Sequence, residues 1–205
     1  AGNSDFFLRV LRPRDHWRLF QDMREYAVAL DIETSGYTVQ QGGYVTMVGL
    51  YDGFDYRPLV RGDGLDKKQL SHELAGYKYL ITFFGTVFDL PFLKEALGFQ
   101  YAGLHFDLCF AARRAGIKGG LKKLEQLLGI PRDESVKGFD GFDAVRLWNA
   151  AERGSSQARE LLEAYNRCDT VNLFELADIL YYMLRAQTGV HAFMEQSALQ
   201  RRRGC

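Results

Sequence analysis

The chain has 205 residues, of which 47% are hydrophobic and 25% charged, a composition sufficient for one well-cored domain. Its 26 basic and 26 acidic side chains balance, which excludes a strongly basic field over the whole molecule and the acidic excess of a disordered chain. Three widely spaced cysteines without a CxxC pair predict neither a disulfide framework nor a zinc site; they are Cys109, Cys168 and Cys205.

The cysteine usage fits a reducing cytoplasm, where we expect the protein to be located. No apolar run approaches the ~20 residues that a membrane helix needs, and the first residues lack the apolar core of a signal peptide, so we expect no membrane association. We expect a single domain over residues 1–205, with a core at about 26–180, a short N-terminal helix and a solvated C-terminal tail ending in QRRRGC.

Residues 13–23 show helical spacing, and three closely connected strand-like runs follow them. After residue 65 the pattern alternates between helix and strand. The strand-like runs are 26–34, 43–53 and 54–62, and the alternating segments are a helix at 66–77, a strand at 78–84, a helix at 91–98 and a strand at 104–108. Short connections predict antiparallel pairing, whereas strands that alternate with helices predict parallel pairing.

Amphipathic segments complete the chain. Leucines recur on one face over residues 121–128, a second segment covers 142–154, and a long helix is predicted to begin near Ser155. The whole pattern predicts an α/β fold in which antiparallel strands come first, parallel strands follow, and helices flank the sheet.

Two carboxylates stand at the end of the first strand-like run, in the sequence YAVALDIETSG. Side chains of a strand alternate between faces, so Asp31 and Glu33 project from the same side. Two like charges held together resist ionisation unless a cation or a shared proton relieves them. The pair therefore predicts a metal site, for which the rest of the chain must supply further ligands.

Asp89 follows the strand at 78–84 and stands at the mouth of the next helix, where α/β sheets commonly place their sites. A second interpretation is helix capping, because Asp is a favoured N-cap and Pro91 suits a first helical turn. In the long C-terminal helix, Tyr165 and Asp169 are four residues apart and share one face. The apolar residues around Asp169 favour a buried acid that needs a partner over a solvent-facing one.

Three ordered motifs in the chain resemble those of DEDDy exonucleases in the RNase H-like superfamily. They are DIETSG at 31–36, FGTVFD at 84–89, and the Tyr-x-x-x-Asp pattern of Tyr165 and Asp169. A wider resemblance, to the bacterial YprB-like family of predicted exonuclease domains, covers residues 26–180. Its further segments are LITFFGTVFDLPFL, RRAGIKGGLKKLEQLLGI, GFDAVRLW and YNRCDTVNL.

The resemblance implies an RNase H-like mixed sheet of five strands, three antiparallel and then two parallel. It also implies a metal-binding tetrad that holds two Mg²⁺ or Mn²⁺ ions about 4 Å apart. The tetrad consists of Asp31, Glu33, Asp89 and Asp169. By the same resemblance, Tyr165 orients the attacking water; a phenol with a pKa near ~10 is a poor base at neutral pH, so we expect it to position rather than abstract a proton.

Phe84 departs from the family pattern, which has Asn before this glycine. We expect this change to weaken capture of the 3′-terminal nucleotide, because an amide is lost, and to spare the metal ligands. The opposing interpretation is that the ring stacks on the terminal base and replaces the amide. Basic residues around a Gly-Gly loop at 119–120 are either phosphate ligands or solvated side chains. Asp107 is either a helix cap or a support for the site. The candidate substrate-binding residues are Thr34, Phe84, Phe88, Lys118 and Lys122.

These features predict a metal-dependent 3′→5′ exonuclease that acts by two metal ions on single-stranded DNA or RNA with a free 3′ end. Two alternatives stay open. An RNase H-like endonuclease would share the acidic strand pair, and a binding module with little or no turnover would fit the change at Phe84.

Overall fold

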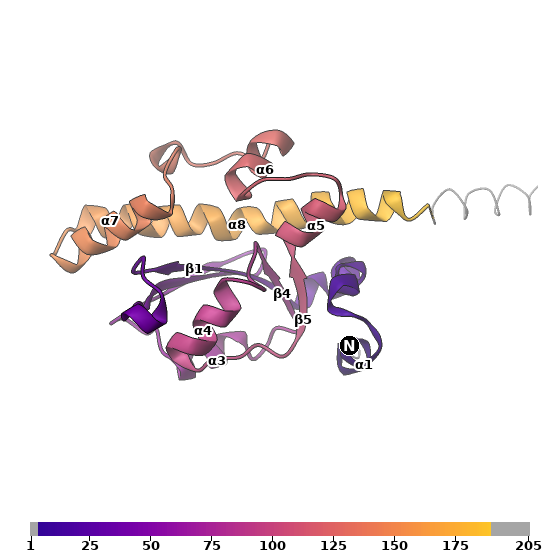
Figure 1. The fold of residues 1–205 in the computed structure, drawn as a ribbon, viewed down its shortest axis with the longest axis horizontal. Coiled ribbons are helices and arrows are strands. Elements are labelled where there is room, and N and C mark those ends of the chain that lie inside the picture. Colours follow the sequence, from indigo (N-terminus) through magenta and orange to yellow (C-terminus); the bar gives the residue numbers. More distant parts are fainter. Residues whose placement is uncertain (1–3, 190–205) are drawn as a thin grey trace, which may run out of the picture.

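The computed structural model describes residues 4–189, which fold into a central sheet covered by helices on both faces (Figure 1). The expected C-terminal tail at 200–205, with Cys205, lies outside the described residues. Within the described part of the chain, no helix combines the length and apolar character that a membrane span requires.

The sheet has five strands in the order β3-β2-β1-β4-β5. The first three strands pair antiparallel, and β1, β4 and β5 run parallel, which confirms the predicted mixed sheet. The bounds are β1 Ala27–Thr34, β2 Val45–Tyr51, β3 Tyr56–Val60, β4 Tyr79–Thr82 and β5 Leu104–Asp107.

Eight α-helices surround this sheet within the described residues. They are α1 Ser4–Val10, α2 Phe20–Met23, α3 Lys67–Leu74, α4 Asp89–Leu97, α5 Leu108–Arg114, α6 Leu121–Leu128, α7 Gly141–Glu152 and α8 Ser156–Gln187. The predicted start of the long helix is confirmed, because the Ser155 hydroxyl accepts a hydrogen bond from the backbone N–H of Ala158 as an N-cap.

The expected continuous helix at 13–23 is wrong. The segment is a 3₁₀ turn over Pro13–Leu19, followed by the single turn of α2. Its buried residues Trp17, Phe20 and Met23 are three apart, a spacing that suits the three-residue repeat of a 3₁₀ helix. Packing of these side chains on the sheet therefore outweighs the α-helical pattern of the segment.

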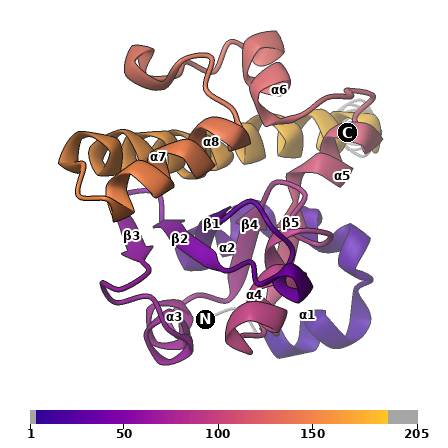
Figure 2. The same cartoon turned by 60° about the vertical axis from the view of Figure 1, so that its left-hand side comes forward.

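The two faces of β1 explain the position of the acidic pair. Val28, Leu30 and Ile32 pack in the cluster that includes α3 and α4, while Ala27 and Ala29 pack in the cluster beneath α8. Figures 1 and 2 show α8 along one face of the sheet, and α3 and α4 on the opposite face. Asp31 and Glu33 continue the face of Ala27 and Ala29, so they point toward α8.

Candidate active site

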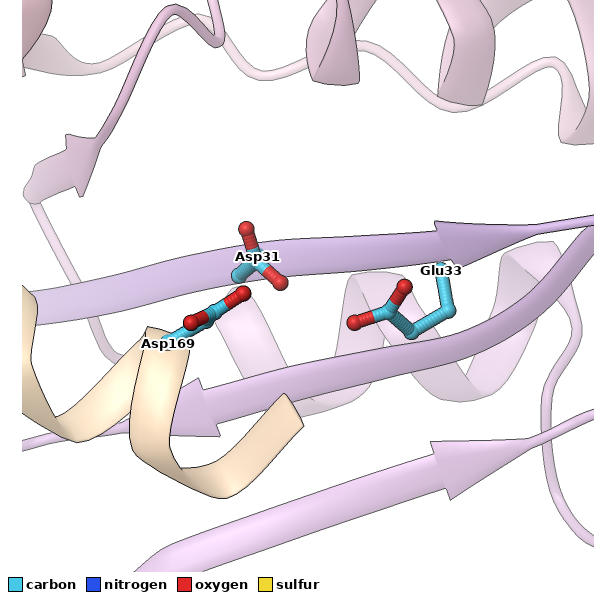
Figure 3. A group of neighbouring side chains, drawn as sticks. All are labelled: Asp31, Glu33 and Asp169. Atoms are coloured by element: carbon cyan, nitrogen blue, oxygen red, sulfur yellow. The ribbon is translucent and has the colours of Figure 1, made fainter. Parts of the chain in front are cut away.

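A cleft of about 760 Å³ opens where the end of β1 meets α8, the start of α7 and the turn at residues 83–89. Asp31 and Glu33 from β1 and Asp169 from α8 lie inside it, and each offers an oxygen atom within 4.8 Å of the others (Figure 3). Asp169 comes 136 or more positions after the two strand acids, and folding brings the three together in one acidic cluster.

Asn166 holds the two strand carboxylates in place. Its Nδ2 donates to Asp31 Oδ2 at 2.9 Å and to Glu33 Oε1 at 3.4 Å. Its Oδ1 accepts from the hydroxyl of Tyr56 at 2.9 Å, so the amide is bonded at both ends while fully buried. A satisfied buried amide of this kind orients its partners, because any other placement leaves a polar group unpaired.

Gly49 lets α8 approach the sheet closely enough for this contact. It pairs with Asp31 across β1 and β2. A Cβ at this position would lie 2.1 Å from Asn166 Oδ1 and 2.4 Å from Thr170 Oγ1. A side chain would therefore force α8 away from the acidic pair.

Two cations reach Asp169 from the segment between α5 and α7. Arg132 Nη2 lies 2.5 Å from Asp169 Oδ1, and Arg132 Nη1 donates to both carboxylate oxygens of the buried Glu125. Lys122 Nζ lies 3.9 Å from Asp169 Oδ2 and donates to the Tyr165 hydroxyl at 2.6 Å. These basic side chains offset part of the negative charge in the cluster.

Three carboxyl groups that line the cleft, those of Asp31, Glu33 and Asp89, nevertheless have raised pKa values. Burial, with the charges of Glu33 and Asp169 next, raises the pKa of Asp31 well above its ordinary value. Burial and the Asp169 charge raise the pKa of Glu33 to about 8, and burial raises that of Asp89 to about 7. A divalent cation would relieve this cost, because oxygen ligands of this charge and spacing suit a hard ion.

Asp89 lines the same cleft from α4 but is not one of the three acids whose oxygen atoms lie within 4.8 Å of one another. It is buried, it is the first residue of the helix, and its Oδ1 accepts a hydrogen bond from the Ile32 backbone N–H at 3.2 Å. The capping interpretation is wrong, since the N-cap position is Phe88 and no side chain caps this helix. Asp89 is thereby fixed to the strand residue that lies between Asp31 and Glu33.

The turn before Asp89 has an unusual backbone. Phe84 has φ 66°, the one positive φ of a non-glycine residue among those described. Asp107 supports this turn: its Oδ1 accepts from the backbone N–H of Phe84 at 3.0 Å, and its Oδ2 from that of Thr86 at 2.9 Å. It also caps α5 by accepting from the Cys109 N–H, so both interpretations of Asp107 hold.

The predicted substrate residues lie in different places. Thr34, Phe84 and Phe88 line the cleft. Lys122 instead contacts Tyr165 and Asp169, and Lys118 lines a neighbouring hollow.

Sequence reasoning missed three residues of the site: Asn166, Arg132 and Glu125. Asn166 had a detectable signal, since it lies three residues before Asp169 and therefore on the same helix face. Arg132 and Glu125 had none, because their contact with α8 depends on how the segment at 115–140 folds back.

A known protein family matches most of the chain. The family model of the RNase_H superfamily matches residues 28–181. No curated protein matches the sequence.

Solved structures with a similar fold include nucleases. One is the apo form of a nuclease, with TM-score 0.60 and 24% identity over 84% of this chain and 80% of that chain. Brucella melitensis NrnC with bound Mg²⁺ gives 0.59 and 22% over 82% and 78%, and NrnC is also solved bound to pGG. Escherichia coli RNase D, an exoribonuclease involved in structured RNA processing, gives 0.58 and 19% over 92% and 48%. At these identities the likeness shows a shared RNase H-like α/β fold.

Proposed function

Because the chain belongs to the RNase_H superfamily, we propose that it is a metal-dependent 3′→5′ exonuclease of the DEDDy type, with the bacterial YprB-like domains as its subfamily. One observation carries the proposal: Asp31, Glu33 and Asp169 converge within 4.8 Å in a cleft that Asp89 and Tyr165 also line. The substrate is single-stranded DNA or RNA with a free 3′ end.

The residues present fit divalent cations. Asp31, Glu33 and Asp169 would hold one Mg²⁺ or Mn²⁺ ion, and Asp31 with Asp89 a second. Such ions would supply activation of the attacking water and stabilisation of the charge that develops on the phosphate. The Mg²⁺ bound to NrnC, which shares the fold, supports this choice of ion.

Tyr165 positions water in this proposal. Burial, with the charges of Asp169 and Glu33 next, raises the pKa of its phenol, so the hydroxyl keeps its proton. The Lys122 ammonium donates to the phenol oxygen and leaves the Tyr165 O–H directed elsewhere, as a donor for a water molecule or a phosphate oxygen. Lys122 therefore acts as a positioning residue rather than as a phosphate ligand.

Digestion of 5′-labelled DNA and RNA oligonucleotides tests the proposal. With Mg²⁺ or Mn²⁺ we expect a ladder that shortens from the 3′ end, and with EDTA no product. Asp31→Asn should lose activity by orders of magnitude, because it removes a metal-binding charge. The matched control Asp22→Asn, at an exposed carboxylate, should retain it.

Other outcomes would contradict the proposal. Cleavage of a circular single strand would identify an endonuclease. Binding of oligonucleotides without metal-dependent hydrolysis would identify a nucleic-acid-binding module.

A further inference from the structure

We propose that a hollow beside the cleft, lined by Phe84, Arg113 and Lys118, together with the neighbouring ring of Phe110, which contacts Phe84 and Arg113, is a second subsite that binds the nucleotides preceding the 3′-terminal one. This inference rests on the proposed function, because cleavage at the 3′ end sets the direction in which the nucleic-acid strand lies in the site. It adds a substrate requirement: the chain should prefer oligonucleotides long enough to fill both subsites.

The hollow borders the catalytic cleft, because the two share lining residues. It has a volume of about 760 Å³, and Phe83 and Phe84 line both spaces. The remaining residues around it are Cys109, Arg113, Lys118, Gly119 and Gly120. None of them is acidic, so a strand that leaves the acidic cluster along this path meets only neutral and positive groups.

Two aromatic rings offer surfaces for bases. The centroids of Phe84 and Phe110 lie 6.2 Å apart with the ring planes tilted by 35°. Phe110 is 42% exposed although it is a large apolar side chain. Exposed rings along a channel favour single strands of any sequence, because every base has a π-face that can stack.

Two cations without carboxylate partners stand beside these rings. The Arg113 guanidinium carbon lies 5.5 Å from the centroid of Phe110 and 6.0 Å from that of Phe84. Among the described residues neither Arg113 nor the exposed Lys118 forms an ion pair, whereas the next residue, Arg114, pairs with Asp15. Positive side chains without acidic partners can bind the successive phosphates of a nucleic-acid backbone.

The backbone of Phe84 agrees with this role. A bulky residue at φ 66° is strained, and Asn adopts that conformation more readily. Asp107 holds the turn through two backbone N–H groups and so maintains the strained geometry that places the ring between the two spaces.

Oligonucleotides of two to eight nucleotides test the subsite. We expect kcat/KM to rise with length in the wild type. Phe110→Ala should lower kcat/KM on the octanucleotide by about five- to 150-fold, the range for loss of one base–aromatic stack, with a smaller loss on the dinucleotide. Arg113→Gln should weaken octanucleotide binding and reduce its salt dependence. The controls are Phe54→Ala and Arg153→Gln, both exposed and remote from the hollow.

Phe84→Asn distinguishes the two interpretations of that position. We expect a higher melting temperature, because the strain is relieved, together with weaker octanucleotide binding, because the ring is lost. A gain in kcat/KM for this variant would overturn the stacking role.

Binding measured in EDTA by fluorescence anisotropy separates this inference from the proposed function. If the wild type binds longer oligonucleotides more tightly, and Phe110→Ala and Arg113→Gln abolish that gain, the subsite stands even if no turnover is found. If turnover is found but affinity and kcat/KM show no length dependence, or the variants match their controls, the subsite is overturned while the exonuclease proposal stands.

Discussion

Single residues explain how the acidic cluster is held in position. One buried amide, Asn166, contacts both strand carboxylates, and two basic side chains, Lys122 and Arg132, contact Asp169. Burial, with the charges of neighbouring carboxylates next, still raises the pKa values of Asp31 and Glu33. Tyr165 and Glu33 allow the clearest tests at this scale.

We expect Tyr165→Phe to keep metal binding but to lose about ten- to a thousandfold in kcat, because the hydroxyl that orients water is removed. Steady-state kinetics and metal titration would measure the two effects. Tyr181→Phe is a matched control, since it is a buried tyrosine of α8 remote from the cleft. Equal activity of Tyr165→Phe and wild type would remove Tyr165 from the mechanism.

We expect Glu33→Gln to raise the melting temperature of the metal-free protein at pH 8 and to change it little at pH 5. The pKa of Glu33 is about 8 in the folded protein against an ordinary 4.5, so the unfolded chain loses this proton first as the pH rises. The carboxyl therefore costs stability that grows between these two values. Thermal melts in EDTA across this pH range would measure it. A difference that does not vary with pH would show that Glu33 is not the group responsible.

At the scale of elements, the site depends on the contact between α8 and the β1–β2 pair. Asn166, Asp169 and Thr170 lie on the buried face of α8, and Gly49 on β2 provides the space for them. The acidic strand end alone would not form the cluster, because Asp169 reaches it only when α8 lies this close.

We expect Gly49→Ala to destabilise the protein by about 1–3 kcal/mol, the usual effect of overpacking, and to lower activity by moving α8 away from Asp31. For a chain of this size that corresponds to a fall of about 2–12 °C in melting temperature. Gly76→Ala is the control, since a Cβ there would have no neighbour within 4 Å. Similar stability and activity for both variants would contradict the close approach.

At the scale of the whole molecule, the proposed metal site joins elements from both ends of the chain. The proposed ligands come from β1, α4 and α8, so a bound ion would connect the first strand of the sheet with the long helix α8. The unfolded chain has no such assembled site, so a bound ion should stabilise only the folded protein.

We expect Mg²⁺ or Mn²⁺ at a hundredfold over its Kd to stabilise the protein by about 2.7 kcal/mol. The melting temperature should rise by roughly 5–11 °C, as differential scanning fluorimetry would show. Asp31→Asn should lose most of this rise. An equal rise in that variant would place the metal elsewhere.

The sequence by itself determined the fold class and the principal acids. Side-chain alternation in the first strand placed Asp31 and Glu33 on one face, and the alternation of strands with helices predicted parallel pairing. Helical spacing placed Tyr165 and Asp169 on the same helix face. These are local periodicities, which backbone geometry imposes on any chain that forms those elements. The irregular segment at 13–23 was predicted less well, since packing against the sheet selected its conformation.

Only the tertiary structure decided how the acids are supported. Asn166 contacts Asp31 across 135 positions, and Lys122 contacts Tyr165 across 43. Asp107 holds the turn at Phe84 across 23. Such contacts leave no periodic trace in the sequence. They depend on the close packing of α8 on the sheet, which Gly49 permits, and on the turn that Asp107 holds.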